Sequence, residues 1–240
     1  MFHVEHSKIP LHFVQKKETS TLRQKLLLLL LSLLLLLSGC QFNIQPEGGA
    51  FAEALLRNRY YGEVSEDYLR LALVSPEQAA EDYEETLAAE MAFLCEYTGV
   101  RQENADAVLL RRVTAALCSR ISFSVGEQQV SEGVIAVPVT VRPLRLFDHI
   151  AMEEYVSVVL PLWEKYGIAV DESPDLTAAE RNRYEREFLT AMLSLLESRL
   201  ADAPYSGEET VSLRLEQEGD YYRPNAEDLA AIHALVLGYE

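Results

Sequence analysis

The sequence predicts an α+β fold, with several helices packed on one face of a small, mainly antiparallel sheet of about four strands. Apolar residues recur at helical spacing over long stretches, and several of these stretches begin with capping residues. Between them lie two pairs of segments in which apolar and polar residues alternate, as in half-buried strands. The order of helices, hairpin, helices, hairpin and helix indicates one α+β domain, which we assign to residues 50–240.

Four helices are predicted before the first strand. Ser75 is a capping serine, followed by Pro76 at the first helical position and by Gln78 three residues after the serine. Gly99 is placed to end the helix that they begin. The apolar stripe expected on the fourth helix consists of Val108, Leu109, Val113, Ala116 and Leu117. The four predicted ranges are 50–60, 65–74, 76–97 and 104–119.

The pattern then changes to strand alternation, beginning with Ile121, Phe123 and Val125. Residues 126–133 are predicted to form a turn. Pro138 cannot donate a hydrogen bond to a ladder, so we expect its strand to lie at an edge of the sheet or to turn its prolines outward. The predicted strands are 121–125, 135–142, 211–215 and 221–223.

Three further helices are predicted. Pro161 is expected to kink or split the first of them. Thr177 and Glu180 form a capping box that opens the longest helix, and Asn225 caps the last one. The predicted ranges are 148–166, 177–201 and 225–237, with a loop at 167–174.

The N-terminal part carries a leucine run from Leu26 to Leu37. Twelve helical residues cover roughly 18 Å, which is too short for a bilayer core of about 30 Å but suits the apolar part of a signal peptide. Lys16, Lys17, Arg23 and Lys25 provide the positive flank that such a peptide needs. We therefore expect residues 1–39 to be a cleaved signal peptide.

Residues 37–40 read Leu-Ser-Gly-Cys, which resembles the lipobox of bacterial lipoproteins. The resemblance implies that Leu37, Ser38 and Gly39 are recognised by the signal peptidase. It also implies that Cys40 carries a covalent diacylglycerol with palmitate-like chains, since the thiol is the nucleophile that takes the lipid. Two acyl chains give stable membrane anchoring. The predicted location is therefore the extracytoplasmic face of the cell membrane, with residues 40–49 as anchor and flexible tether.

The start of the chain suggests a separate hypothesis. MFHVEH can be encoded by ATGTTCCACGTGGAACAT, which is its own reverse complement and resembles the sites bound by chromosome-partition proteins. Under this hypothesis translation begins downstream, for instance at Val14 or Leu22 through a GTG or TTG codon. Any other codons for residues 1–6 in the gene would contradict it.

The composition of the remaining chain limits its partners. The first 40 residues hold five of the 21 Lys and Arg residues and two of the 38 Asp and Glu residues, so the other 200 carry a net charge of −20. Such a surface repels nucleic acid and anionic lipid headgroups, so we expect no nucleic-acid partner and a membrane contact through the lipid alone. Cys95 and Cys118 are expected to be buried free thiols, because their predicted helices place them too far apart for a disulfide.

Three segments resemble uncharacterised lipoproteins of Gram-positive, clostridia-like bacteria: GEVSEDYLRLALVSPEQAAEDYEE, VPVTVRPLRLFDHIAMEE and YYRPNAEDLAAIHALVLGY. The resemblance covers most of residues 50–240. It implies an α+β domain, compatible with a cystatin-like or NTF2-like arrangement, and a membrane-anchored location. The group supplies no activity that could be transferred to this chain.

Candidate chemistry is sparse. His149 and Glu153 have the spacing of two ligands on one helix face, but a stable zinc site needs three or four ligands, so no metal site and no cofactor other than the lipid are expected. The acidic run Glu81, Asp82, Glu84 and Glu85 is interpreted as a solvated helix face. Seven tyrosines either pack at the rim of the core or line a groove for a sugar, peptide or other apolar ligand. They are Tyr60, Tyr61, Tyr68, Tyr83, Tyr97, Tyr221 and Tyr222.

Three functional hypotheses remain open on the sequence. The first is a non-enzymatic binding or adaptor module that holds a protein, peptide or wall component at the outer face of the membrane. The second is a solute- or peptide-binding lipoprotein, although the chain lacks the repeated βαβ units of two-lobed binding proteins. The third is an enzyme with an unrecognised pocket, for which His149 or His233 beside a carboxylate would be the signal.

Overall fold

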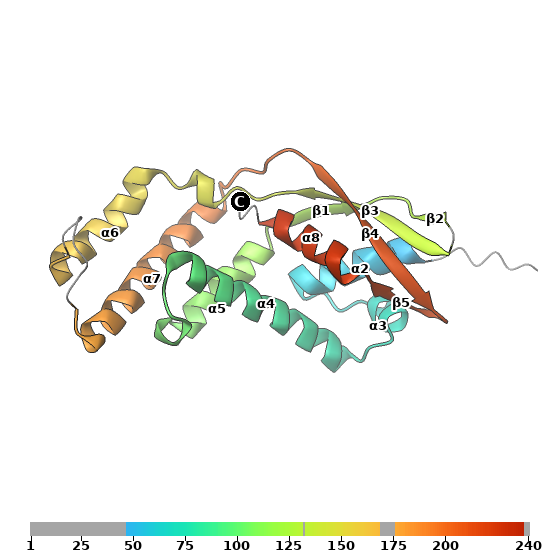
Figure 1. Ribbon diagram of the computed structural model, residues 1–240, viewed down its shortest axis with the longest axis horizontal. Coiled ribbons are helices and arrows are strands. Elements are labelled where there is room, and N and C mark those ends of the chain that lie inside the picture. The colour runs from blue at the N-terminus through green and yellow to red at the C-terminus, as the bar shows by residue number, and fades with distance from the viewer. Residues whose placement is uncertain (1–46, 132, 169–175, 238–240) are drawn as a thin grey trace, which may run out of the picture. The chain divides into compact units, whose positions relative to one another are not determined.

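The computed structural model describes residues 47–131, 133–168 and 176–237, and it confirms the α+β prediction (Figure 1). The described helices are α2 (Gly48–Tyr61), α3 (Glu66–Ala72), α4 (Pro76–Thr98), α5 (Ala107–Cys118), α6 (Met152–Tyr166), α7 (Ala178–Leu200) and α8 (Ala226–Val236), with 3-10 turns at Gln102–Asn104 and Phe147–His149. The strands are β1 (Ser122–Val125), β2 (Gln129–Ser131), β3 (Val134–Arg142), β4 (Glu209–Glu218) and β5 (Tyr221–Pro224). The loop predicted at 167–174 falls mostly outside the described residues.

The sheet is antiparallel throughout, in the order β1-β3-β4-β5, with β2 also pairing with β3. β3 is therefore central, and the edge position predicted from Pro138 is wrong. β1 pairs with residues 139–142 of β3 and β2 with residues 134–136, so Pro138 faces the break between them. The Pro138 carbonyl accepts from Gly126 N on that side, at 2.8 Å. The backbone N–H and C=O of one strand residue point toward the same neighbouring strand. The N–H that Pro138 lacks would therefore point into the break between β1 and β2.

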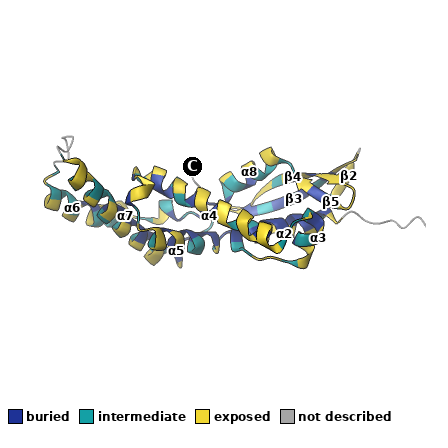
Figure 2. Ribbon diagram, turned by 90° about the horizontal axis from the view of Figure 1, so that it is seen from below, coloured by how far each residue is buried: buried dark blue, intermediate teal, exposed yellow. Residues whose placement is uncertain are grey.

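One face of the sheet is buried. Four alternate residues of β3, together with Leu213 and Leu215 of β4, are at most 2 % exposed, and the residues between them point toward solvent. The four are Ile135, Val137, Val139 and Val141. α2 and α8 cover this face, and Figure 2 shows buried residues on α2 and on the strands as well as along other helices. The helices that cover the sheet thus pack on one face, as predicted, while α4, α5, α6 and α7 pack mainly on other helices.

The first turn of α2 lies directly on the sheet. Gly48 is buried, and a Cβ added to it would come within 2.7 Å of Ile135 Cγ2. Glycine is therefore needed for this close approach. Glu47 N donates to the Tyr222 hydroxyl at 2.8 Å, which holds the helix start against β5. Gly48 and Gly49 are consequently helical, which corrects the expectation that they end a flexible tether.

The caps predicted from the sequence are present. Ser75 and Gln78 form a reciprocal capping box, and so do Thr177 and Glu180. Gly99 ends α4 in the left-handed conformation, and the Asn225 side chain accepts from two backbone N–H groups at the start of α8. These helices begin and end where they do because local side chains satisfy their terminal backbone groups.

Several predicted boundaries are wrong. Asp106, rather than a residue near 104, caps α5, and Val108 of the expected stripe is 77 % exposed. The single helix predicted for residues 148–166 is instead a 3-10 turn, Phe147–His149, followed by α6. Pro161 lies inside α6 and does not split it. The predicted turn at 126–133 contains β2, a strand whose three residues are all exposed.

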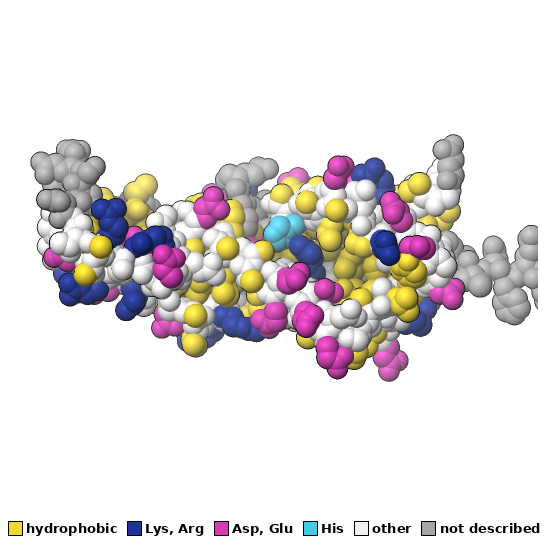
Figure 3. All heavy atoms as spheres, turned by 60° about the horizontal axis from the view of Figure 1, so that its bottom comes forward, with side chains coloured by type: hydrophobic (Ala, Val, Ile, Leu, Met, Phe, Trp, Pro, Cys, Tyr) yellow, Lys and Arg dark blue, Asp and Glu magenta, His cyan; other side chains and the backbone are white. Residues whose placement is uncertain are grey.

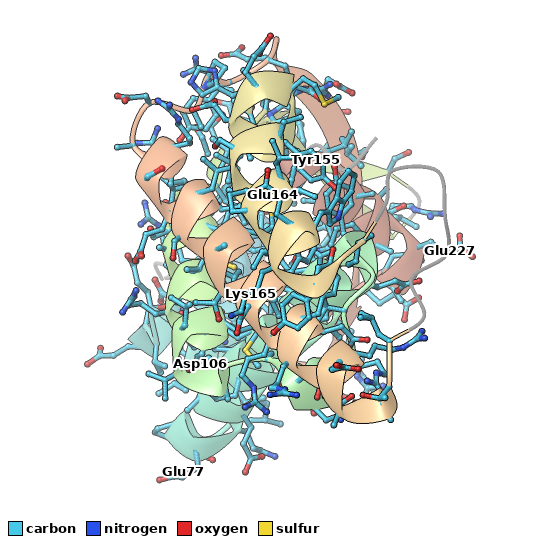
Figure 4. All side chains as sticks on the ribbon, turned by 90° about the vertical axis from the view of Figure 1, so that its left-hand side faces the viewer. Glu77, Asp106, Tyr155, Glu164, Lys165 and Glu227 are labelled. Atoms are coloured by element: carbon cyan, nitrogen blue, oxygen red, sulfur yellow. The ribbon has the colours of Figure 1, made fainter. Side chains whose placement is uncertain are left out.

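α6 and α7 pack side by side, as Figure 4 shows from the end of the molecule that carries them. Trp163 Nε1 donates to the Tyr184 hydroxyl at 3.3 Å. Lys165, on the side of α6 that faces α7, forms an ion pair with Glu187 at 2.6 Å. Only Val159 of α6 is buried. The helix is therefore attached mainly to α7.

Candidate functional site

A cavity of about 500 Å³, called the main cavity, lies between α2, α3, α4 and β5. Figure 3 faces the side of the domain that carries α4, α8 and β5, where hydrophobic side chains in a hollow are bordered by charges of both signs. The cavity is lined by Phe51, Leu55, Asn58, Arg59, Tyr68, Ala72, Asp82, Glu85, Thr86, Ala89, Tyr222, Arg223 and Pro224. Its volume lies in the range of small-molecule sites.

The apolar wall is built by α2 and β5. Phe51 and Leu55 are four residues apart and therefore project from the same face of α2. The Phe51 ring stacks on the Tyr222 ring, with centroids 5.5 Å apart and planes inclined by 26°. Because the Tyr222 hydroxyl also accepts the hydrogen bond from Glu47, this ring is fixed at both its face and its tip.

Arg59 follows Leu55 by one helical turn. The face of α2 that carries the apolar Phe51 and Leu55 therefore also carries the positive charge of Arg59. Its side chain is half-buried, and among the described residues no carboxylate lies within 4 Å of it.

Asn58, which precedes Arg59 in the sequence, is 1 % exposed. Its Nδ2 donates to the Ala79 carbonyl at 3.0 Å, while its Oδ1 finds no hydrogen-bond donor among the described residues. Buried polar atoms without a partner are uncommon in folded proteins, so this oxygen has a free capacity to accept a hydrogen bond.

The residues of α4 that line the cavity include two carboxylates, Asp82 and Glu85. The Tyr68 hydroxyl donates to Asp82 at 2.7 Å, and burial together with this hydrogen bond raises the pKa of Tyr68 above its ordinary value. The Thr86 hydroxyl donates to the Asp82 carbonyl at 3.0 Å. Glu85 lies one turn further along α4 and is exposed. All four residues of the acidic run are exposed, as expected for a solvated helix face, and two of them, Asp82 and Glu85, also line the cavity.

The seven tyrosines do not form one groove. Tyr68 and Tyr222 line the main cavity, whereas Tyr60, Tyr61 and Tyr83 line a smaller one of about 290 Å³. The remaining two are elsewhere: Tyr97 packs on Phe93 and Phe147, and Tyr221 bonds to Glu218. Arg59 and Asn58 were missed by sequence reasoning. The sequence did contain one signal for Arg59: it continues the four-residue spacing of Phe51 and Leu55, which places a charged residue on the same helix face as two apolar ones.

The weak metal candidates do not share a helix face. His149 ends a 3-10 turn and Glu153 lies in the first turn of α6, and both are exposed. The helix on which their spacing depended begins only at Met152, so the two residues are not one turn apart. No group of three or more His, Cys, Asp or Glu residues that could hold a metal ion occurs in the described ranges.

His233 does lie beside a carboxylate. Its Nε2 is 3.0 Å from Oε1 of Glu90, whose side chain is 2 % exposed. The Tyr60 ring stacks on the imidazole with planes inclined by 2°. Neither His233 nor Glu90 lines the main cavity. The pair joins α8 to α4 within the core.

Cys95 and Cys118 are buried free thiols, as predicted. Burial raises the pKa of the Cys118 thiol to about 12 and also raises that of Cys95. Neither thiol is therefore a reactive nucleophile in this conformation. Cys40 and the lipobox residues Leu37, Ser38 and Gly39 lie outside the described residues, as do Val14, Leu22 and the whole leader. Among the residues that are described, no helix is both long and apolar enough to cross a bilayer.

Comparison with known proteins gives one structural likeness. No protein-family model matches the chain, and no curated protein matches it either. The crystal structure of a candidate lipoprotein, YcdA, from Bacillus subtilis is similar at a TM-score of 0.50, with 14 % identity over 79 % of this chain. The match covers 55 % of YcdA, so this chain corresponds to about half of that protein. At this identity the likeness shows a shared fold; the cystatin-like or NTF2-like arrangement stays a prediction.

Proposed function

We propose that this protein is a lipid-anchored, extracytoplasmic binding module that holds a small ligand in the cavity between α2, α4 and β5. The cavity itself carries the proposal, because it combines an aromatic wall with Arg59 and with Asn58 Oδ1, which has no hydrogen-bond partner among the described residues. Sites for small molecules have this composition: mostly apolar walls with a few convergent polar groups.

The lipid anchor is supported by two observations. The leucine run ends in the lipobox that contains Cys40, and a protein of similar fold is itself described as a candidate lipoprotein. The proposal is tested by labelling cells with radioactive palmitate. We expect label in the wild type and none in Cys40→Ala, which should also leave the membrane fraction. Label that persists in Cys40→Ala would contradict the anchor.

The binding function is tested by filling the cavity. Ala89 lines it, whereas the neighbouring Ala88 is also exposed on α4 but does not line it. Detergent-solubilised full-length protein is screened by thermal shift against peptides, sugars and cell-wall fragments. We expect that Ala89→Trp abolishes the shift produced by a ligand and that Ala88→Trp does not. Ligands that act equally on both variants bind elsewhere.

The adaptor alternative predicts a different result. Crosslinking on intact cells, with wild type and Cys40→Ala as bait, would then recover one protein partner that depends on the anchor. If Ala89→Trp left that partner bound and no compound were blocked by Ala89→Trp in the screen, the cavity would not be the functional site.

A further inference from the structure

We infer that the cavity takes a short peptide with free ends, whose terminal carboxylate is bound by Arg59 and whose terminal ammonium lies at the side of Asp82 and Glu85. This inference rests on the proposed binding function and names its ligand class.

Arg59 is the feature that selects a carboxylate. Most arginines of the described domain form ion pairs, as Arg57 does with Glu53 and Glu63 on the same helix. Arg59 is half-buried in the cavity wall, and no described carboxylate lies within 4 Å of it. A guanidinium binds a planar carboxylate through paired hydrogen bonds, and partial burial strengthens this interaction.

The acidic side selects against a ligand that carries only negative charge. Asp82 and Glu85 line the same cavity as Arg59 without pairing with it. A phosphate or a dicarboxylate would be attracted by Arg59 and by Arg223, which already pairs with Glu218, and repelled by two carboxylates, so the lining offers it no net attraction. A zwitterion satisfies both sides, because its ammonium meets the carboxylates while its carboxylate meets the arginine. Opposite charges on α2 and α4, which line one cavity without forming an ion pair with each other, thus match a molecule with opposite charges at its two ends.

The space between the charged sides suits a peptide rather than a free amino acid. A cavity of about 500 Å³ lies in the volume range of sites for drug-sized ligands, which a short peptide matches better than a single amino acid does. Phe51, Leu55 and Tyr222 form an apolar and aromatic surface for its side chains. β5, which contributes Tyr222 to Pro224, pairs with β4 alone among the described strands and so leaves one edge unpaired. Extended peptides bind to such edges.

The test uses the dipeptide leucyl-phenylalanine and isothermal titration of the full-length protein in detergent. The free dipeptide is compared with its C-terminal amide and its N-acetyl derivative. We expect the amide to bind about tenfold more weakly or worse, since it loses a charge-assisted hydrogen bond to Arg59. The N-acetyl derivative should also lose affinity, because it no longer carries the ammonium.

Matched variants assign each end of the peptide to its side of the cavity. Arg59→Gln should remove the preference for the free acid over the amide, while Arg57→Gln, on the same helix but outside the cavity, should keep it. Glu85→Gln should reduce the preference for the free ammonium, and Glu81→Gln should not. A merely structural role of Arg59 would weaken both ligands equally and would contradict the inference.

The outcomes separate this inference from the proposed function. If leucyl-phenylalanine and other apolar dipeptides do not bind but a different compound is blocked by Ala89→Trp, the ligand class is wrong and the cavity remains a binding site. If no compound is blocked by Ala89→Trp, both proposals fail. A dipeptide that binds with equal affinity in Ala89→Trp would also overturn the inference.

Discussion

α2 and α6 are helices of similar length that are packed in very different ways. Eight of the 14 residues of α2 are buried between the sheet and the other helices, whereas one of the 15 residues of α6 is buried. α6 exposes four large apolar side chains, Met152, Tyr155, Val156 and Leu160. The difference shows that apolar content does not decide burial; the number of elements that surround a helix does. We therefore expect stability to be concentrated around α2 and the sheet, with α6 opening at lower free energy.

The sharpest test of this comparison replaces one leucine in each helix by alanine. Leu56 of α2 is fully buried, while Leu160 of α6 is 46 % exposed. Leu56→Ala should lower the free energy of unfolding by about 2–5 kcal/mol, because it leaves a cavity in a packed core. Leu160→Ala should change it by no more than about 0.5 kcal/mol. Urea titration of the full-length protein measures both, and similar losses in the two variants would refute the comparison.

The same contrast explains which parts of the fold could be predicted. Helix ends set by local side chains, such as Ser75 and Thr177, are accurate because their hydrogen-bond partners lie three residues away in the sequence. The position of β3 was not predictable from Pro138, because it depends on where β1 ends and β2 begins. That register is set by long-range pairing, and no local pattern encodes it.

The candidate site shows the same limit. Tyrosines are conspicuous in the sequence, and two of the seven, Tyr68 and Tyr222, do line the cavity. Arg59 was missed because the sequence does not reveal that it has no carboxylate partner among the described residues, while Arg57, two residues before it, has two. Whether a charge is paired depends on neighbours from other elements, and these appear only in the folded chain.

A second test concerns the two histidines of the described residues. His233 joins α8 to the buried Glu90 of α4, whereas His149 is exposed before α6. His233→Ala removes a partner of a buried carboxylate and the ring that stacks on Tyr60, and should cost about 1–3 kcal/mol of stability. His149→Ala should leave the midpoint of thermal unfolding unchanged. A loss in His149→Ala as large as that in His233→Ala would show that the region before α6 is as tightly packed as the core.

The smallest expected effect is the pH dependence of two ion pairs, one in each region. Arg214 of β4 holds Asp228 of α8 through its Nε at 2.7 Å, and this hydrogen bond lowers the pKa of Asp228 below its ordinary value of 3.8. The pair therefore stabilises the fold fully above about pH 4, and its contribution is lost as the pH falls through the lowered pKa. Asp228→Asn should lower the free energy of unfolding by about 1 kcal/mol at pH 7, and the difference from the wild type should shrink below pH 4.

The second ion pair joins α6 to α7. Lys165 also lowers the pKa of Glu187, but this carboxylate is 38 % exposed and screened by solvent, so Glu187→Gln should have the smaller effect. Urea titrations between about pH 2.5 and pH 7 measure both effects. A loss for Asp228→Asn that stays constant with pH would show that the charge of Asp228 does not cause it. A larger loss for Glu187→Gln would place the stronger pair beside α6 and reverse the comparison.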